Sequence, residues 1–127
     1  MLTRNTDKDW ECFATSDPYY AVATHEKFHR DNLNEDVRRE FFEVGQRHVE
    51  QIFKIIHTYF ASGFRPSRAL DFGCGVGRLV VPLAELCRSV VGVDVSESML
   101  LEAKINCDRR GISNVDFIRG DDELHVS

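Results

Sequence analysis

Three glycines at alternate positions, Gly73, Gly75 and Gly77, follow a short apolar run in the segment ALDFGCGVGR (residues 69–78). Glycine is the costliest residue to order, so chains use it where the backbone turns tightly or is approached closely by another group. A glycine-rich turn between a strand and a helix leaves bare N–H groups beside the positive end of the helix, which suits ligand binding. A tight turn without a ligand would use the same glycines, so the turn alone leaves both interpretations open.

Two acidic residues follow the next apolar runs of the chain. Asp94 closes the run VVGVD, and Asp121 comes directly after NVDFIRG. In doubly wound folds an acidic residue at the end of the second strand binds ribose hydroxyls, and ligands lie outside the carboxyl ends of the strands. The glycine turn and both carboxylates therefore face one crevice, and we expect that crevice to bind a nucleoside.

The charges around the glycine turn indicate which nucleoside. The dinucleotide fingerprint is Gly-x-Gly-x-x-Gly, but here the third glycine comes one residue early and Arg78 stands in its place. Asp71 puts a carboxylate inside the first apolar run, where it would repel a pyrophosphate and attract a cationic ligand. S-adenosylmethionine carries an ammonium and a sulfonium group and has no phosphate, so the pattern favours it as the cofactor.

The segments ALDFGCGVGR, VVGVDVSESML and NVDFIRGD resemble the first three signature segments of the class I S-adenosylmethionine-dependent methyltransferases, a Rossmann-like, seven-stranded family. They stand in the family's order and at its usual separations, and the resemblance covers about residues 66–122. The FFEVGQRHVEQIF segment before them is similar to a helix that many bacterial members place before the core. The resemblance implies an enzyme that transfers a methyl group.

The resemblance also implies a set of cofactor-binding residues: Asp71, Gly73, Cys74, Gly75, Gly77, Asp94, Val95, Met99 and Asp121. By this comparison Gly73, Cys74 and Gly75 offer backbone groups to the methionine part of the cofactor. Asp71 would lie near the cofactor's amino group. The small Cys74 side chain is expected to pack and not to react.

The adenosine part of the cofactor is assigned in the same way. Asp94 would hold both ribose hydroxyls, with Val95 and Met99 flanking the adenine. Asp121 would bind the adenine amino group. Catalytic residues stay unknown, and no metal is expected, because the four cysteines show no zinc-like spacing with one another or with histidine.

The elements that would position these residues alternate along the second half of the chain. Residues 68–72, 89–93 and 114–119 form short apolar runs typical of strands, and residues 78–87 and 96–110 are typical of helices. Such alternation predicts an α/β fold with right-handed crossovers. We expect a Rossmann-like doubly wound parallel sheet, truncated after about the third strand and preceded by a long N-terminal helix.

That long helix is predicted for about residues 34–61, with apolar residues at three- and four-residue steps. Asn34 is the expected N-cap and Gly63 the expected C-cap. Gly45 lies inside the helix, where it is either tolerated or marks the close approach of another group. Pro82 should delay or bend the helix that follows the glycine turn.

Three domains are expected along the chain. Residues 1–33 form a leader with one short helix near residues 24–30, residues 34–64 form the long helix packed on the core, and residues 65–127 form the first half of the cofactor-binding domain. No apolar stretch nears the ~20 residues of a membrane span, and no secretory signal opens the chain. A cytoplasmic location without membrane partners is expected.

The charge balance bears on the methyl acceptor. The chain of 127 residues has a formal net charge of −5, which disfavours bulk attraction to nucleic acid. We therefore expect a small-molecule acceptor and no nucleic acid partner. Only the first three strands of the family's sheet are recognised, so the chain alone is expected to bind the cofactor weakly and to show no methyl transfer. The first strand would then have an exposed edge, and we expect a homo-oligomer to form through that edge.

Two other functions stay open at this point. One is a non-catalytic module that binds S-adenosylmethionine or associates with itself. The other is an NAD(P)-binding oxidoreductase domain, against which the early Gly77 and the acidic Asp71 both argue.

Overall fold

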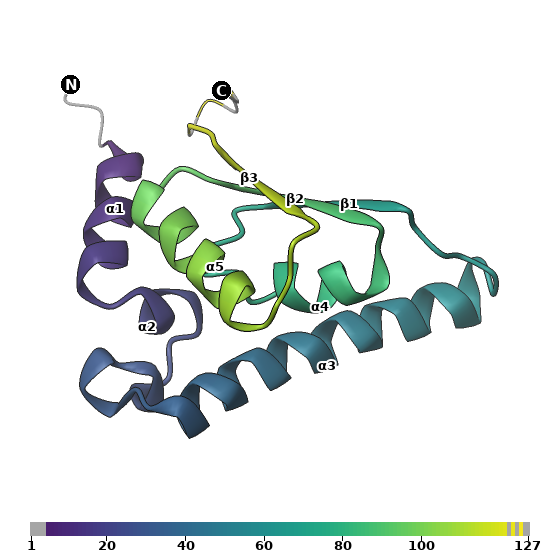
Figure 1. Cartoon of the computed structure of the whole chain (residues 1–127), viewed down its shortest axis with the longest axis horizontal. Helices are drawn as coiled ribbons and strands as arrows, with labels where there is room; N and C mark the ends of the chain where they lie inside the picture. Colours follow the sequence, from purple (N-terminus) through teal and green to yellow (C-terminus); the bar gives the residue numbers. More distant parts are fainter. Residues whose placement is uncertain (1–4, 122, 124, 126–127) are drawn as a thin grey trace.

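A computed structural model describes residues 5–121, 123 and 125 of the chain. Its helices and strands, in chain order, are α1 (Thr6–Ser16), α2 (Pro18–Val22), α3 (Glu35–Tyr59), β1 (Arg68–Phe72), α4 (Val80–Leu86), β2 (Ser89–Asp94), α5 (Glu97–Arg109) and β3 (Val115–Arg119). Two short 3-10 turns at Glu26–Phe28 and Arg30–Asn32 join α2 to α3. Figure 1 shows α4, α5 and α3 on the same side of the sheet, with α1 and α2 at the end where the strands finish.

The described sheet is parallel throughout, in the order β1-β2-β3. One row of the register joins Leu70 of β1 to Val91 of β2, and Val91 to Asp116 of β3. The predicted α/β fold with a parallel, Rossmann-like sheet behind a long helix is confirmed. β1 is an edge strand of the described sheet, and Leu70 is 63% exposed on the face turned away from the helices. Self-association through that edge stays a prediction.

The long helix α3 begins as predicted and ends differently. The Asn34 side chain accepts a hydrogen bond from the backbone N–H of Val37 at 2.9 Å, the geometry of an N-cap. The helix closes at Tyr59, where the N–H of Phe60 donates to the carbonyl of Ile56. The predicted C-cap role of Gly63 is therefore wrong, because the helix stops four residues earlier.

The close approach that Gly45 could mark is present. A Cβ atom built on Gly45 would lie 2.2 Å from the carbonyl oxygen of Arg78 and 2.9 Å from its Cγ. The turn that leads into α4 thus rests directly on the bare backbone of α3. Pro82 stands in the first turn of α4, and the helix starts at Val80, two residues after its predicted start, as the proline suggested.

The leader is more regular than the sequence predicted. The short helix expected near residues 24–30 is present only as a 3-10 helix at Glu26–Phe28, and a second one follows at Arg30–Asn32. Helix α1 forms instead behind Asn5, which accepts a hydrogen bond from the N–H of Lys8 at 3.1 Å. Helix α2 begins at Pro18, a residue that fits the first helical position as well as a turn.

Side chains of the leader join the main core. Tyr19 and Phe28 are buried in the same apolar cluster as Phe41 of α3 and Val90 of β2. Among the described residues, no helix combines the length and the apolarity that crossing a bilayer requires. The division of the chain into the three predicted domains stays a prediction.

Candidate functional site

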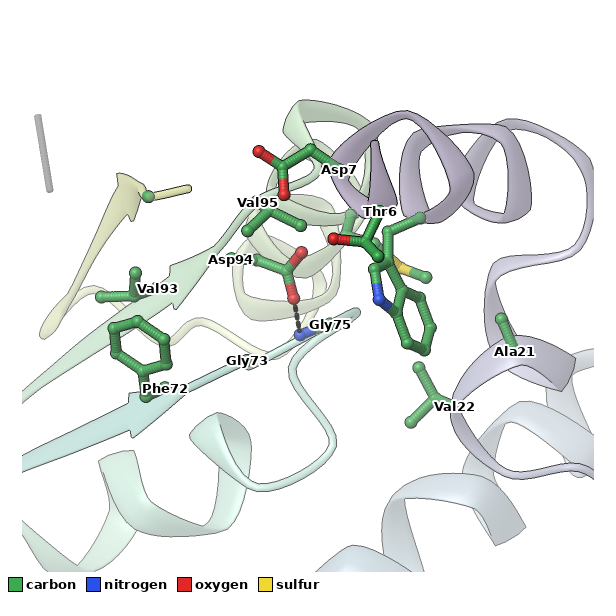
Figure 2. Close-up of a pocket in the computed structure, with 13 residues that line it drawn as sticks. Thr6, Asp7, Ala21, Val22, Phe72, Gly73, Gly75, Val93, Asp94 and Val95 are labelled. Atoms are coloured by element: carbon green, nitrogen blue, oxygen red, sulfur yellow. Dashed lines mark hydrogen bonds between the residues drawn. The ribbon is translucent and has the colours of Figure 1, made fainter. Parts of the chain in front are cut away.

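A cavity of about 380 Å³ opens at the carboxyl ends of the strands (Figure 2). Such a volume lies in the usual range for small-molecule sites, roughly 300–1,000 Å³. The turn after β1, the end of β2, the start of α5 and the two N-terminal helices enclose it. It is lined by Thr6, Asp7, Trp10, Ala21, Val22, Phe72, Gly73, Gly75, Val93, Asp94, Val95, Met99 and Gly120.

The glycine turn presents its backbone to this cavity. Gly75 has φ +54°, and a Cβ atom there would lie 3.0 Å from Cγ2 of Val22. The N–H of Gly75 donates a hydrogen bond to Oδ2 of Asp94 at 2.8 Å. The neighbouring N–H groups of Gly73 and Cys74 both donate to the carbonyl of Val93 at the end of β2. The turn is thereby fixed to the second strand.

Asp94 holds two parts of the site together. While Oδ2 accepts from Gly75, Oδ1 accepts from the N–H of Ser96 at 2.9 Å, at the start of α5. Each carboxylate oxygen can accept two hydrogen bonds, so both oxygens keep capacity toward the cavity that Asp94 lines. A carboxylate fixed in this way is suited to accept hydrogen bonds from a pair of hydroxyl groups.

The structure brings five of the predicted site residues to the cavity wall: Gly73, Gly75, Asp94, Val95 and Met99. Four others, Asp71, Cys74, Gly77 and Asp121, lie outside the lining. Gly77 has φ +94° and lies against Ala103 of α5, so it serves the packing of the turn.

Cys74 points away from the cavity, into the core beneath the sheet. The residue is 3% exposed, and its Sγ lies close enough to Gly92 that an added Cβ there would be 3.1 Å away. Burial raises the pKa of the Cys74 thiol, with the nearby Asp94 and Asp71 carboxylates adding to the effect. These contacts agree with the prediction that Cys74 packs and does not react.

Asp71 and Asp121, two carboxylates that do not line the cavity, have pKa values shifted in opposite directions. Burial raises the pKa of Asp71; the charge of Arg78 opposes this shift and that of Asp94 reinforces it. The Asp121 carboxylate is already engaged in its own turn, where it accepts from the N–H groups of His125 at 2.8 Å and Glu123 at 3.0 Å. Hydrogen bonds from His125 and Glu123 lower the pKa of Asp121.

Sequence reasoning missed every cavity residue that comes from the leader: Thr6, Asp7, Trp10, Ala21 and Val22. Trp10 is the single tryptophan of the sequence and is 44% exposed. No motif surrounds Trp10. The one sequence feature that could have pointed to it as a site residue is that the chain has a single tryptophan.

Glu11 anchors α1 beside the cavity. Its carboxylate accepts hydrogen bonds from the hydroxyls of Ser96, at 2.5 Å, and Ser98, and from the N–H of Ser98 at 3.3 Å. Burial alone would raise the pKa of Glu11, but the hydrogen bonds from the two serines outweigh it and lower the pKa. The negative charge also sits at the N-terminus of α5, where the helix dipole favours it.

Tyr19 anchors α2 in a comparable way. Its hydroxyl donates to Oε1 of Glu102 at 2.6 Å and lies 3.1 Å from Oδ1 of Asn106. Asn106 is buried and donates from Nδ2 to the carbonyl of Val76, within the glycine turn, at 3.0 Å. The leader, α5 and the turn therefore form one hydrogen-bonded assembly around the cavity.

The chemistry of the lining fits S-adenosylmethionine. The charged side chains among the lining residues are the carboxylates of Asp7 and Asp94, and no lysine or arginine is among them. A cationic nucleoside suits such a site, whereas a pyrophosphate would lack a counter-charge. Apolar Val95 and Met99 and the aromatic ring of Trp10 offer surface for a base. No group of histidine, cysteine, aspartate or glutamate in the described part could hold a metal ion.

The sequence also matches known proteins. Residues 69–125 match a protein-family model described as a methyltransferase domain. A 23S rRNA (uracil(1939)-C(5))-methyltransferase RlmD of Aeromonas hydrophila is 37% identical over 78 residues, which are 61% of this chain and 17% of that protein. The protein of the same name from Marinomonas posidonica is 42% identical over 52 residues, 41% of this chain and 12% of that protein. The chain thus spans at most about a fifth of the length of these relatives.

These relatives correct one prediction. An acceptor that is a small molecule and the absence of a nucleic acid partner were expected, and proteins named as rRNA methyltransferases contradict that expectation. The expectation rested on the net charge of −5. Net charge averages over a whole surface and does not exclude a local basic area. One hollow between α3 and α5 is lined by four arginines and by Glu35, which pairs with the first of them: Arg38, Arg39, Arg109 and Arg110.

Solved structures agree with the fold. A phosphoethanolamine N-methyltransferase 1 of Haemonchus contortus, in complex with phosphoethanolamine and S-adenosylhomocysteine, superposes with a TM-score of 0.62 at 16% identity, over 91% of this chain and 21% of that one. The N-terminal domain of EvdMO1 with S-adenosylhomocysteine bound gives 0.51 at 21% identity, over 62% and 31% of the two chains. At these identities the likeness concerns the fold alone.

Proposed function

Residues 69–125 belong to the class I S-adenosylmethionine-dependent methyltransferases, and from this premise we propose that the cavity beside Asp94 binds S-adenosylmethionine as the methyl donor of an RNA methyltransferase. The observation that carries the donor assignment is the Asp94 carboxylate, which the N–H groups of Gly75 and Ser96 hold in a cavity whose lining has two carboxylates and no cationic side chain. A cytoplasmic location belongs to the same proposal.

Within this proposal each part of the wall has a task. Asp94 accepts hydrogen bonds from the ribose hydroxyls, and Val95 and Met99 cover the adenine. The turn at Gly73 and Gly75 approaches the methionine part of the donor. Bound S-adenosylmethionine supplies a methyl group on a good leaving group, so the residues of the chain contribute positioning and exclusion of water. Asp71, Cys74, Gly77 and Asp121 do not line the cavity, and their part in binding the donor stays a prediction.

The donor assignment is tested by titrating the chain with S-adenosylhomocysteine in a calorimeter. We expect Asp94→Ala to raise the dissociation constant about tenfold or more, because a hydrogen bond to a charged group contributes about 1.5–3 kcal/mol. The variant also frees the N–H groups of Gly75 and Ser96. Emission of Trp10, the single tryptophan, gives a second readout of the same titration.

Asp116→Ala is the matched control, because Asp116 lies exposed on β3, outside the cavity lining. It should bind S-adenosylhomocysteine like the unmodified chain. NADH should give no binding heat in the same calorimetric titration. No binding by the unmodified chain, or equal binding by Asp94→Ala, would contradict the donor assignment.

The RNA acceptor rests on the names of the curated relatives, which include two RNA methyltransferases described as uncharacterized. In cells that carry Asp94→Ala in the gene, we expect one methylated nucleoside of total RNA to fall below its level in unmodified cells. Mass spectrometry of digested RNA measures this, with Asp116→Ala cells as the control. Unchanged RNA nucleosides would reject the RNA acceptor and leave the donor site standing.

A further inference from the structure

One carboxylate oxygen at the cavity is buried without a partner. Oδ1 of Asp7, in the first turn of α1, has no hydrogen bond within the described part of the chain. Asp7 is not needed to cap α1, because the side chain of Asn5 already accepts from Lys8. Leaving a buried acceptor unsatisfied is costly. Asp7 also lines the cavity, so a rotation of its carboxylate group would bring this oxygen to an N–H or O–H donor of a bound ligand and remove that cost.

The position of Asp7 is fixed by its own helix. Glu11, one helical turn further along α1, binds the hydroxyls of Ser96 and Ser98 at the start of α5. Positions four apart lie on one face of a helix, so Asp7 and Glu11 face α5 together. In Figure 2, Asp7 and Val95 lie on one side of the Asp94 carboxylate, and Phe72 and Gly73 lie on the other.

This arrangement orders the parts of the donor along the cavity. With the ribose at Asp94, the methionine part extends toward Gly73 and the adenine toward Val95, as the proposed function has it. The donor group that adenine carries at its outer edge is the exocyclic amino group, with two N–H bonds. Asp121, the residue predicted to bind that group, already accepts hydrogen bonds from His125 and Glu123 and does not line the cavity.

We propose that Asp7 of α1 accepts a hydrogen bond from the adenine amino group of the donor and so selects adenine, in the place predicted for Asp121. This inference rests on the proposed function. It makes α1 part of the binding site, with Glu11 as the positioning residue that fixes the helix. Base recognition would then come from the leader and not from the loop after β3.

The test compares S-adenosylhomocysteine with S-inosylhomocysteine, in which an oxo group replaces the amino group. An oxo group cannot donate to Asp7, so the unmodified chain should prefer the adenosyl compound about tenfold or more. Asp7→Asn keeps the shape of the side chain, and its amide can accept from the amino group through Oδ1 or donate to the oxo group through Nδ2. We expect this variant to bind the adenosyl compound more weakly, because the acceptor is no longer charged, and to narrow the preference because it also accommodates the oxo group.

Two further variants separate a binding role from a structural one. Asp121→Asn tests the rival assignment and should keep the preference of the unmodified chain, and Asp116→Asn is the control outside the cavity. Asp7→Ala should lose the preference, and thermal unfolding shows whether each variant is folded. A preference that survives in both Asp7 variants, or is lost in Asp121→Asn, would overturn the inference. If the unmodified chain binds neither compound, the proposed function itself fails.

Discussion

Replacing Gly45 with alanine should lower the free energy of unfolding by about 3 kcal/mol, the upper end of the usual cost of overpacking. Alanine normally stabilises a helix interior by about 1 kcal/mol relative to glycine, so the expected sign is opposite to that of helix propensity. The reason is the carbonyl oxygen of Arg78, only 2.2 Å from where the new Cβ would lie. That oxygen belongs to the backbone, so a change of rotamer cannot relieve the clash.

Urea unfolding of the variant measures this effect, and Gly63→Ala is the matched control. A Cβ on Gly63 would have no neighbour within 4 Å, so this control should change the unfolding free energy by no more than about 0.5 kcal/mol. If Gly45→Ala is as stable as the unmodified chain, α3 and the turn at Arg78 are further apart than the structure places them.

The same substitution should reach the cavity. Arg78 follows directly on Gly77, so pushing the turn away from α3 displaces the backbone that presents Gly75 to Asp94. We therefore expect weaker binding of S-adenosylhomocysteine by Gly45→Ala along with the lost stability. Gly45 of α3 thus lets the turn at Arg78 pack closely enough to keep the wall of the cavity in place.

The second half of the fold could be predicted from sequence because its signals are local. Each parallel strand is a short apolar run, and the predicted strand at residues 68–72 matches β1 residue for residue. Ser96 starts α5 by accepting from the N–H of Met99, which is the ordinary chemistry of an N-cap. The glycine turn and Asp94 follow the strands at fixed offsets, so their meeting in space followed from the topology.

The leader could not be predicted in this way, because single long-range contacts hold it in place. Glu11 meets Ser96 across 85 positions of the chain, and Tyr19 meets Asn106 across 87. Neither pair leaves a periodic pattern in the sequence. Pro18 was ambiguous for a different reason: it fits a turn and the first residue of a helix equally well, and here the helix prevailed.

Asp121 stands where the family pattern predicts it, but the pattern does not specify its hydrogen bonds in the folded chain. Its position after the third strand agrees with the pattern, but its Oδ1 accepts from two backbone N–H groups of the turn that follows, and its Oδ2 lies 3.0 Å from Nδ1 of His125. Side-chain hydrogen bonds of this kind compete with ligand binding and depend on residues that come later in the chain. The unpaired oxygen of Asp7 is the complementary case: no motif points to it, and only the folded leader places it at the cavity.

Truncating Phe41 to alanine should cost about 3–5 kcal/mol of unfolding free energy, the range typical of a fully buried phenylalanine. Phe41 is 0% exposed, and its ring lies edge-on to those of Tyr19, Phe28 and Phe42 at 5.1 to 5.3 Å between centroids. Two of these partners, Tyr19 and Phe28, belong to the leader. Since whole domains are stable by only about 5–15 kcal/mol, most of the stability of the chain could be lost.

Phe60→Ala is the control, because Phe60 is 81% exposed at the end of α3 and should change stability by about 0.5 kcal/mol or less. Leucine in Phe41→Leu fills part of the space that Phe41→Ala leaves empty, so it should lose less unfolding free energy. This keeps the comparison measurable if the alanine variant unfolds.

The same substitutions should affect the leader, because Tyr19 packs on Phe41 and ties α2 to Asn106. A less tightly packed Tyr19 ring should loosen the leader and expose Trp10 further to water. A red shift of tryptophan emission in folded Phe41→Leu would report this. Unchanged stability in both Phe41 variants would mean that the leader does not pack on α3, and the cavity would then lose the wall that α1 and α2 provide.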